Sequence, residues 1–202
     1  MQEQILCNIA LGDSVVAADP CYDEGVWCAE FGVEMKPGNY EVRVVRGEVK
    51  GTYTAETGEE RTYNWGPRNA RLSVILIDET VERWEALNSL GVDSGRMSIW
   101  DAQNYEDANE GARAWELARY QESPSDYWFN NDNNGCWVDS GLGDGSYFCY
   151  RGRNAKGEPV ALSIVFLYND SVKGTDGRLH IDDEEVLPFV DGPASLWETN
   201  PQ

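Results

Sequence analysis

A glycine-rich acidic run, residues 138–147, is the feature of this 202-residue chain that most constrains its fold. Three glycines and two aspartates fall within the eight residues from Asp139 to Ser146. Glycine at this density indicates backbone that adopts positive φ angles or passes very close to another part of the chain. Residues 146–150, which follow at once, have the composition of a strand. The run predicts a tight turn entering a strand, in which Asp and Ser either cap backbone amides or bind a ligand.

Strand signals extend along most of the chain. Residues 40–45 alternate apolar and polar side chains after a Pro-Gly turn, as a half-buried strand does. Residues 71–77 form a strongly apolar run, and residues 146–151 and 160–168 are joined by turn-forming residues at 153–157. These local hairpin signals favour antiparallel pairing over parallel βαβ units.

Two segments have apolar residues at helical spacing. Val81, Trp84 and Leu87 predict a helix near residues 79–90, which Gly91 ends. A second helix is predicted near residues 104–121. Residues 49–54 are predicted to form a strand that returns antiparallel to residues 40–45. The polar segment 57–67 is predicted to be a loop.

The predicted fold class is α+β: mainly antiparallel β-sheet, arranged as a sandwich or roll, with two helices. The length fits a single domain covering residues 1–202. Within it, an acidic C-terminal segment, about residues 170–202, is expected to be less ordered.

The charge of the chain limits its partners. Asp and Glu number 36 against 16 Lys and Arg, so the formal net charge is −20. Such a charge repels nucleic acid and anionic membranes, and we expect the chain to bind neither directly. It either serves solubility or attracts a basic partner. The oligomeric state is not predicted.

The cysteines and the apolar segments indicate a compartment. The five cysteines are odd in number and include no close C-x-x-C pair, which favours free cytosolic thiols over a disulfide framework or a zinc site. No stretch approaches the roughly 20 apolar residues of a membrane helix. Residues 1–7 lack the basic start of a secretory signal. A cytoplasmic protein is expected.

A second acidic turn, at residues 93–95, is part of the candidate site. If strand 97–100 lay beside strand 146–150, Asp93, Asp101 and the aspartates of the glycine-rich run would converge at one end of a sheet. Close carboxylates serve as an acid/base pair or as a metal cradle. The candidate ligand-binding residues are Asp93, Ser94, Asp101, Asp139, Ser140, Gly143, Asp144, Ser146 and Tyr147.

Several chemistries have no complete motif here. The glycine-rich run lacks the Gly-Lys-Ser/Thr of a phosphate loop, and its serines do not lie in a G-x-S-x-G elbow. The acidic residues between Asp13 and Glu24 have the chemistry of a calcium or magnesium site, but turns between strands also explain them. The first residues of the segment 130–141 have the spacing of a calcium-binding loop, but its twelfth position is Gly141, where such a loop needs a bidentate Glu. No catalytic residue, metal ligand or cofactor is predicted.

The order of the motifs resembles that of a protein family. Asp19-Pro20, Trp84-Glu85-Ala86-Leu87, Val92-Asp93-Ser94-Gly95 and the run from Ser140 to Tyr147 look like a bacterial and phage family known only as a domain of unknown function, with a D-S-G-x-G-D-G-S-Y-type signature. The resemblance spans about residues 12–168. It implies shared ancestry and a bacterial or phage cytoplasmic setting, and it transfers no established activity.

Three functions follow as hypotheses. The first is a non-enzymatic acidic binding protein, phage- or mobile-element-encoded, that acts on a basic host protein or a small ligand. The second is a nucleic-acid mimic that inhibits a DNA-handling enzyme. The third is a metal-assisted hydrolase that uses the clustered aspartates.

Overall fold

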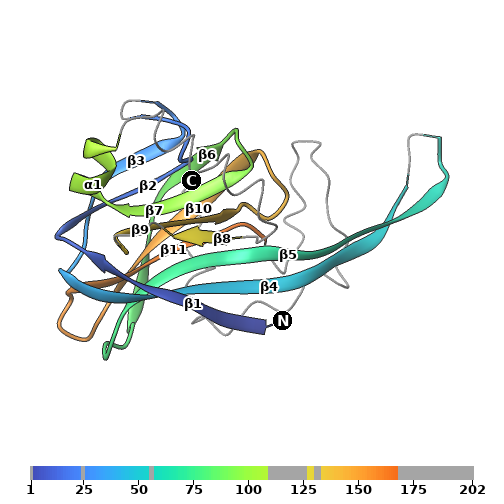
Figure 1. Ribbon diagram of the computed structural model, residues 1–202. Coiled ribbons are helices and arrows are strands. Elements are labelled where there is room, and N and C mark those ends of the chain that lie inside the picture. Colours follow the sequence, from blue (N-terminus) through green and yellow to red (C-terminus); the bar gives the residue numbers. More distant parts are fainter. Residues whose placement is uncertain (1, 24–25, 55–56, 109–126, 130–132, 168–202) are drawn as a thin grey trace.

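Two open antiparallel sheets that share one core make up the fold (Figure 1). The computed structural model describes residues 2–23, 26–54, 57–108, 127–129 and 133–167. Within these ranges the chain forms eleven strands and one short helix. The mainly antiparallel fold predicted from the hairpin signals is confirmed.

The first sheet has six strands. In spatial order they are β1 (Gln2–Leu11), β4 (Gly38–Thr54), β5 (Glu60–Leu76), β11 (Pro159–Val165), β10 (Gly145–Arg153) and β6 (Arg83–Val92). The β10–β11 hairpin has the predicted turn at residues 153–157. β1 and β6 are the edge strands.

The second sheet has five strands. In spatial order they are β3 (Ala29–Glu34), β2 (Ser14–Ala18), β7 (Arg96–Asp101), β9 (Gly135–Asp139) and β8 (Tyr127–Phe129). The helix α1 (Ala102–Asp107) follows β7 directly, and its Tyr105 is buried against Val16 and Trp100. No helix in the described ranges is both long and apolar enough to cross a membrane.

The core lies between the two sheets. The first sheet contributes side chains such as Tyr40, Leu72 and Leu162, and the second contributes Val15 and Ile99, all of them fully buried. Burial of this apolar surface stabilises the fold by about 25 cal/mol per Å² and is the main contribution that holds the two sheets together.

The helix predicted at residues 79–90 is wrong, because this segment contains strand β6. Leu90 and Val92 face the core with the period of two of a strand, while Trp84 and Ala86 pack against Tyr150 on the other face of the sheet. A segment with apolar residues on both faces also matches helical spacing, and its pairing with β10 decides between the two. The expected two helices are therefore not found: of the segment 104–121, only the start lies in α1, and residues 109–126 lie outside the described residues.

Strands β4 and β5 form a long hairpin that projects past the sheets (Figure 1). Their pairing runs from Tyr40 opposite Leu76 to Thr54 opposite Glu60. The loop predicted at 57–67 is wrong for residues 60–67, which belong to β5, and the predicted return of 49–54 onto 40–45 is wrong because both segments belong to β4. The side chains of residues 60–62 are all exposed, so this part of β5 lacks the alternation from which strands are recognised. The predicted acidic segment 170–202 lies outside the described residues.

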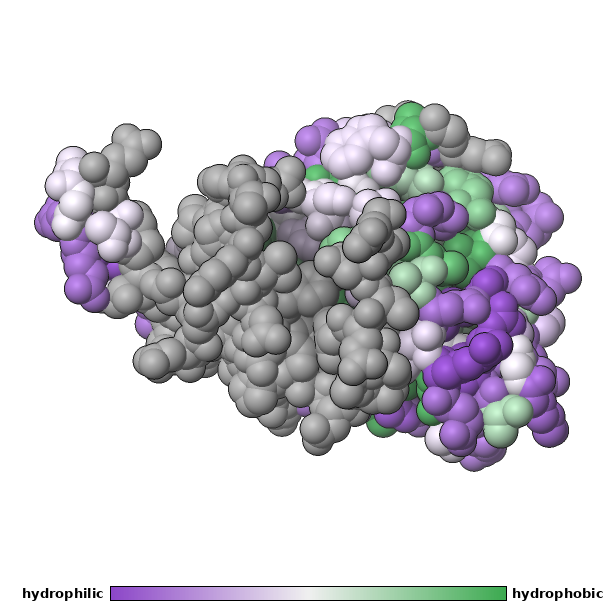
Figure 2. Space-filling view, turned by 180° about the vertical axis from the view of Figure 1, so that it is seen from behind, coloured by the Kyte–Doolittle hydropathy of each residue, from purple (hydrophilic) through white to green (hydrophobic). Residues whose placement is uncertain are grey.

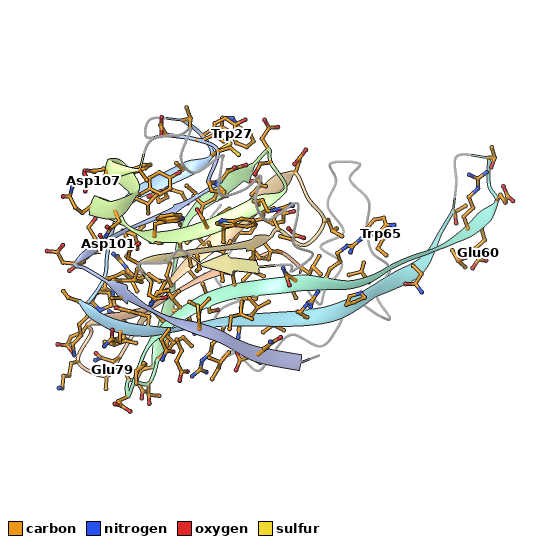
Figure 3. The ribbon with its side chains drawn as sticks, in the orientation of Figure 1. Trp27, Glu60, Trp65, Glu79, Asp101 and Asp107 are labelled. Atoms are coloured by element: carbon orange, nitrogen blue, oxygen red, sulfur yellow. The ribbon has the colours of Figure 1, made fainter. Side chains whose placement is uncertain are left out.

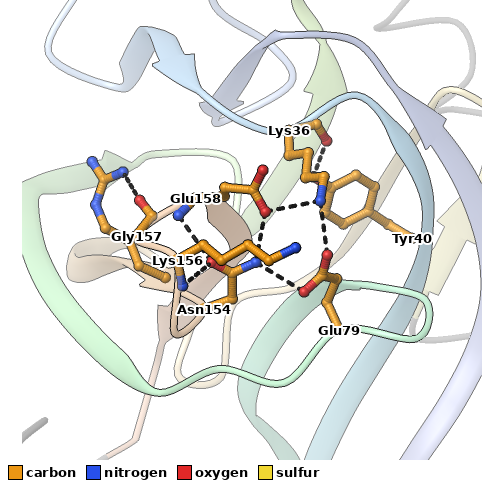
Figure 4. Close-up of polar contacts among 8 residues, drawn as sticks. Lys36, Tyr40, Glu79, Asn154, Lys156, Gly157 and Glu158 are labelled. Atoms are coloured by element: carbon orange, nitrogen blue, oxygen red, sulfur yellow. Dashed lines mark hydrogen bonds and ion pairs between the residues drawn. The ribbon is translucent and has the colours of Figure 1, made fainter.

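A polar network closes the end of the β10–β11 hairpin (Figure 4). Lys36 donates through Nζ to Glu79 at 2.8 Å and to Glu158 at 2.9 Å. Asn154 donates to the same two carboxylates, at 2.9 and 2.8 Å. These contacts lower the pKa of Glu79, chiefly through Lys36, and the pKa of Glu158, chiefly through Asn154.

We expect this network to make stability depend on acid pH. The folded pKa values of Glu79 and Glu158 lie below the ordinary 4.5, so their contribution is present above that pH and is lost as pH falls through the lowered values. Removing the ammonium in Lys36→Met should lower Tm near neutral pH and make Tm fall less between about pH 6 and about pH 3. Thermal unfolding followed by circular dichroism measures both effects.

Lys156→Met is the control, since it removes the same charge from an exposed residue that makes the smallest contribution to the lowered pKa of Glu158. The control should keep most of the acid sensitivity of the wild type. Parallel curves of Tm against pH for the wild type and Lys36→Met would show that the network does not set this dependence.

Candidate functional site

The two glycine- and aspartate-containing turns predicted from the sequence lie side by side. Gly145 pairs with Val92 where β10 meets β6, and the Ser140 amide donates to the Gly95 carbonyl at 3.1 Å. A Cβ on Gly95 would lie 4.0 Å from a carboxylate oxygen of Asp144. The structure thus brings together the turns at residues 93–95 and 140–144.

The strand arrangement expected to create this proximity is wrong. β7 pairs with β2 and β9, and β10 pairs with β6 and β11, so strands 97–100 and 146–150 belong to different sheets. The turns meet instead through the pairing of Arg96 with Asp139 in one sheet and of Val92 with Gly145 in the other. A sequence pattern does not reveal which strand pairs with which.

Asp101 does not join the other candidate residues, because it lies at the opposite end of β7. It caps α1, accepting from the Gly12 amide at 2.7 Å and from the Asn104 amide at 3.3 Å (Figure 3). The predicted convergence of four aspartates is therefore wrong. Within the described ranges, no group of three or more His, Cys, Asp or Glu side chains is placed to hold a metal ion.

Asp19 organises the turn at residues 93–95, a role that sequence reasoning missed. Its carboxylate is fully buried, and its Oδ2 accepts from the backbone amides of Asp93 at 2.8 Å and Ser94 at 2.7 Å. Its Oδ1 accepts from the Ser94 hydroxyl at 2.7 Å and from the Cys21 amide at 3.0 Å. The available signal was an Asp-Pro at the end of the apolar strand β2. Asp19 holds the loop after β2 against the end of β6.

The turn at residues 140–144 is closed by its own polar groups. The Ser140 hydroxyl donates to the Gly143 carbonyl at 2.7 Å, and the Tyr147 hydroxyl contacts the carbonyls of Ser140 and Gly143 at 2.8 and 2.7 Å. Gly141 and Gly143 have φ angles of 61° and 98°, which only glycine adopts readily. These groups build the turn, whereas Asp144 and Ser146 remain exposed at its rim.

Asp139 is held by arginine. Its carboxylate lies 2.9 Å from Nη1 of Arg96, whose guanidinium also stacks on Trp137 at 5.7 Å from the ring centroid. Burial raises the pKa of Asp139, while Arg96, Arg68 and Arg46 oppose this rise. The Asn69 side chain donates to the Asp139 carbonyl at 2.9 Å. This carboxylate therefore serves to join β9 to β7.

All five cysteines are free thiols, as the sequence predicted. Cys28, Cys136 and Cys149 are buried. Burial raises the pKa of Cys7 and Cys28 to about 11, and the pKa values of Cys136 and Cys149 rise further. These four thiols stay protonated near neutral pH, where a nucleophilic cysteine would need to be a thiolate.

Large apolar side chains are exposed beside the paired turns. We call this set the corner patch: Val26 (39% exposed), Trp27 (66%), Leu142 (40%) and Phe148 (38%). The remaining large apolar side chain exposed in the described ranges, Ile5, lies on β1 at the other edge of the first sheet. In the view from behind, apolar surface interrupts strongly hydrophilic surface in the upper part of the molecule (Figure 2).

Trp27 lies beside the edge strand β6, where its ring packs on Gly91 (Figure 3). Tyr147 and its partner Leu90 face the core, so their neighbours Gly91 and Phe148 face outward. A Cβ on Gly91 would lie 1.8 Å from ring atoms of Trp27, so the indole rests directly on the glycine backbone. The Gly91 amide also donates to the Trp27 carbonyl, at 3.3 Å. Sequence reasoning took Gly91 as the end of a helix, but here it provides room for Trp27.

The fold and these turns define a two-sheet antiparallel β protein in which glycine- and aspartate-containing turns join the sheets at one corner. The chain belongs to the family described as "Protein of unknown function (DUF4241)", whose model matches residues 11–164. This confirms the resemblance to an uncharacterised family. A search of the curated proteins found no match, and neither did a search of the solved structures.

Proposed function

We propose that this protein is a non-enzymatic binding protein that uses the corner patch to dock a basic host protein or a small ligand. The observation that carries the proposal is that four exposed large apolar side chains belong to segments that meet at one corner: the loop against Gly91, the turn at residues 140–144 and strand β10. Contiguous exposed apolar surface with a polar rim marks interaction sites in soluble proteins. The proposal includes a bacterial or phage setting, in which the partner belongs to the host.

The composition of the patch suits binding. Trp and Phe are enriched at protein interfaces, and Trp is among the residues that dominate binding energies. The ring of Trp27 packs against Gly91, and this contact restricts the positions that the ring must give up when a partner binds. Such preorganisation lowers the entropy cost of binding.

The charge of the chain favours a basic partner over an acidic one. The formal net charge is −20, and Asp93 and Asp144 are exposed beside the patch. A field of this sign speeds the approach of a basic protein and weakens as salt is added. The patch then provides the apolar contact that persists at high salt.

The engagement of the polar candidates supports binding rather than catalysis. Asp19, Ser140 and Tyr147 are hydrogen-bonded to backbone groups of the turns, and Asp139 is paired with Arg96. These contacts hold the turns at residues 93–95 and 140–144 in place. In the described residues we find no specific observation that favours the mimic or the hydrolase hypothesis.

Affinity capture from a bacterial lysate tests the proposal. Wild type, Trp27→Ala and Ile5→Ala are used as baits at low and at high salt, and bound proteins and small molecules are identified by mass spectrometry. Ile5→Ala is the matched control, since it removes an exposed apolar side chain from the other edge of the sheet. We expect a partner that wild type and Ile5→Ala retain and Trp27→Ala loses. Identical retention by all three baits would contradict the proposal.

A further inference from the structure

We infer that the corner patch recognises a cationic side chain, Arg or Lys, by placing it on the Trp27 indole beside the carboxylates of Asp93 and Asp144. This inference rests on the proposed binding function and adds the chemistry of the partner. A basic segment of a partner protein is the occupant to which it commits.

The indole has the accessibility that a cation requires. The six-membered ring of Trp27 lies against Gly91 through Cε3, Cζ3 and Cη2, yet the residue is 66% exposed. Much of the indole is therefore open to a partner. A guanidinium or ammonium over the face of Trp is attracted by the ring quadrupole, and Trp is the best of the aromatic side chains in this role.

Two carboxylates lie near the ring. Asp93 is two residues beyond Gly91, and Asp144 precedes Gly145, the residue that pairs with Val92. Both are exposed, and the Tyr22 hydroxyl donates to Oδ2 of Asp93 at 2.5 Å, which fixes that side chain. Tyr22 comes from the same loop as Trp27, so one loop orders both the ring and an acidic neighbour.

The charge distribution selects a cation among the ligands that bind aromatic surfaces. An anionic ligand meets both carboxylates and a chain of net charge −20. An uncharged sugar that stacks on Trp27 can donate hydroxyl hydrogen bonds to Asp93 and Asp144, but it gains nothing from the net negative charge of the chain. A cationic side chain gains from the ring and from the carboxylates together.

Two synthetic peptides test the inference. One is an acetylated and amidated octapeptide of alternating Gly and Arg, and the other replaces each Arg with citrulline, which has nearly the same shape but no charge. Binding to the full chain is measured by calorimetry, and the Trp27 indole N–H signal, assigned by its loss in Trp27→Phe, is followed by NMR. The Arg peptide should bind and shift this signal, whereas the citrulline peptide should do neither.

Variants locate the binding site. Trp27→Ala should weaken binding of the Arg peptide about fivefold or more, with Trp27→Phe intermediate. Asp144→Asn should weaken binding more than Asp13→Asn, its control on an exposed aspartate elsewhere, and Ile5→Ala should have no effect. Circular dichroism checks that each variant is folded.

The outcomes separate the inference from the proposed function. Equal binding of the two peptides, or equal affinity of Trp27→Ala and Ile5→Ala for the Arg peptide, overturns the cationic inference, even if a Trp27-dependent partner is captured from the lysate. Binding of the Arg peptide that depends on Trp27 and Asp144 supports the inference, even if no lysate protein is captured.

Discussion

Replacing Asp19 with alanine is expected to lower the free energy of unfolding by about 3–5 kcal/mol. The carboxylate is fully buried, and it accepts from three backbone amides and from the Ser94 hydroxyl. Its loss leaves these donors without an acceptor in a site closed to water. A buried donor without a partner costs about 1–3 kcal/mol, and four neighbouring donors do not add independently.

Chemical denaturation with urea measures this effect, and two variants control it. Asp13→Ala removes an exposed carboxylate six residues earlier in the chain and should change stability by at most about 0.5 kcal/mol. Asp19→Asn keeps one acceptor oxygen and should cost less than Asp19→Ala. If Asp19→Ala were as stable as Asp13→Ala, the result would show that Asp19 does not hold the turn at residues 93–95 in place.

Local signals predicted the parts of the fold that depend on neighbouring residues. Residues 71–77 are apolar enough to be recognised as a strand wherever they lie, and residues 153–157 have the composition of a hairpin turn. Both predictions are confirmed by β5 and by the β10–β11 hairpin. The turn within residues 138–147 is also present, because its glycines require positive φ angles wherever the turn is placed.

The errors concern segments whose structure is decided by distant residues. The segment 79–90 has apolar residues on both faces, and only its pairing with β10 makes it a strand. The polar part of β5, residues 60–67, is a strand because β4 pairs with it along its length. Neither pairing can be predicted from the local sequence.

The candidate site was predicted in part for the same reason. Its two turns were found from their glycines and aspartates, but Asp19 binds a turn more than 70 residues away in sequence. The contact between Trp27 and Gly91 joins residues that are 64 positions apart in the sequence. Asp101 was assigned to the site because strand 97–100 was expected to lie beside strand 146–150, yet Asp101 lies at the opposite end of β7 from the turn at 93–95.

Gly141→Ala should destabilise the protein strongly, by about 3 kcal/mol or more. Gly141 has a φ angle of 61°, so any other residue there adopts the left-handed conformation at a cost of about 1–2 kcal/mol. A Cβ would also lie 2.7 Å from Cβ of Phe166 and 2.9 Å from the carbonyl oxygen of Asn69. These atoms belong to or adjoin the backbone, so a side-chain rotation does not relieve the clash.

Gly143→Ala separates the two contributions within the same turn. Gly143 has a φ angle of 98°, but nothing lies within 4 Å of the Cβ that it would gain. This variant pays only the conformational cost, about 1–3 kcal/mol. Urea denaturation should therefore give a lower free energy of unfolding for Gly141→Ala than for Gly143→Ala. The difference between them measures how closely the turn packs on the chain at Asn69 and Phe166, and equal stabilities would show that the turn does not pack there in solution.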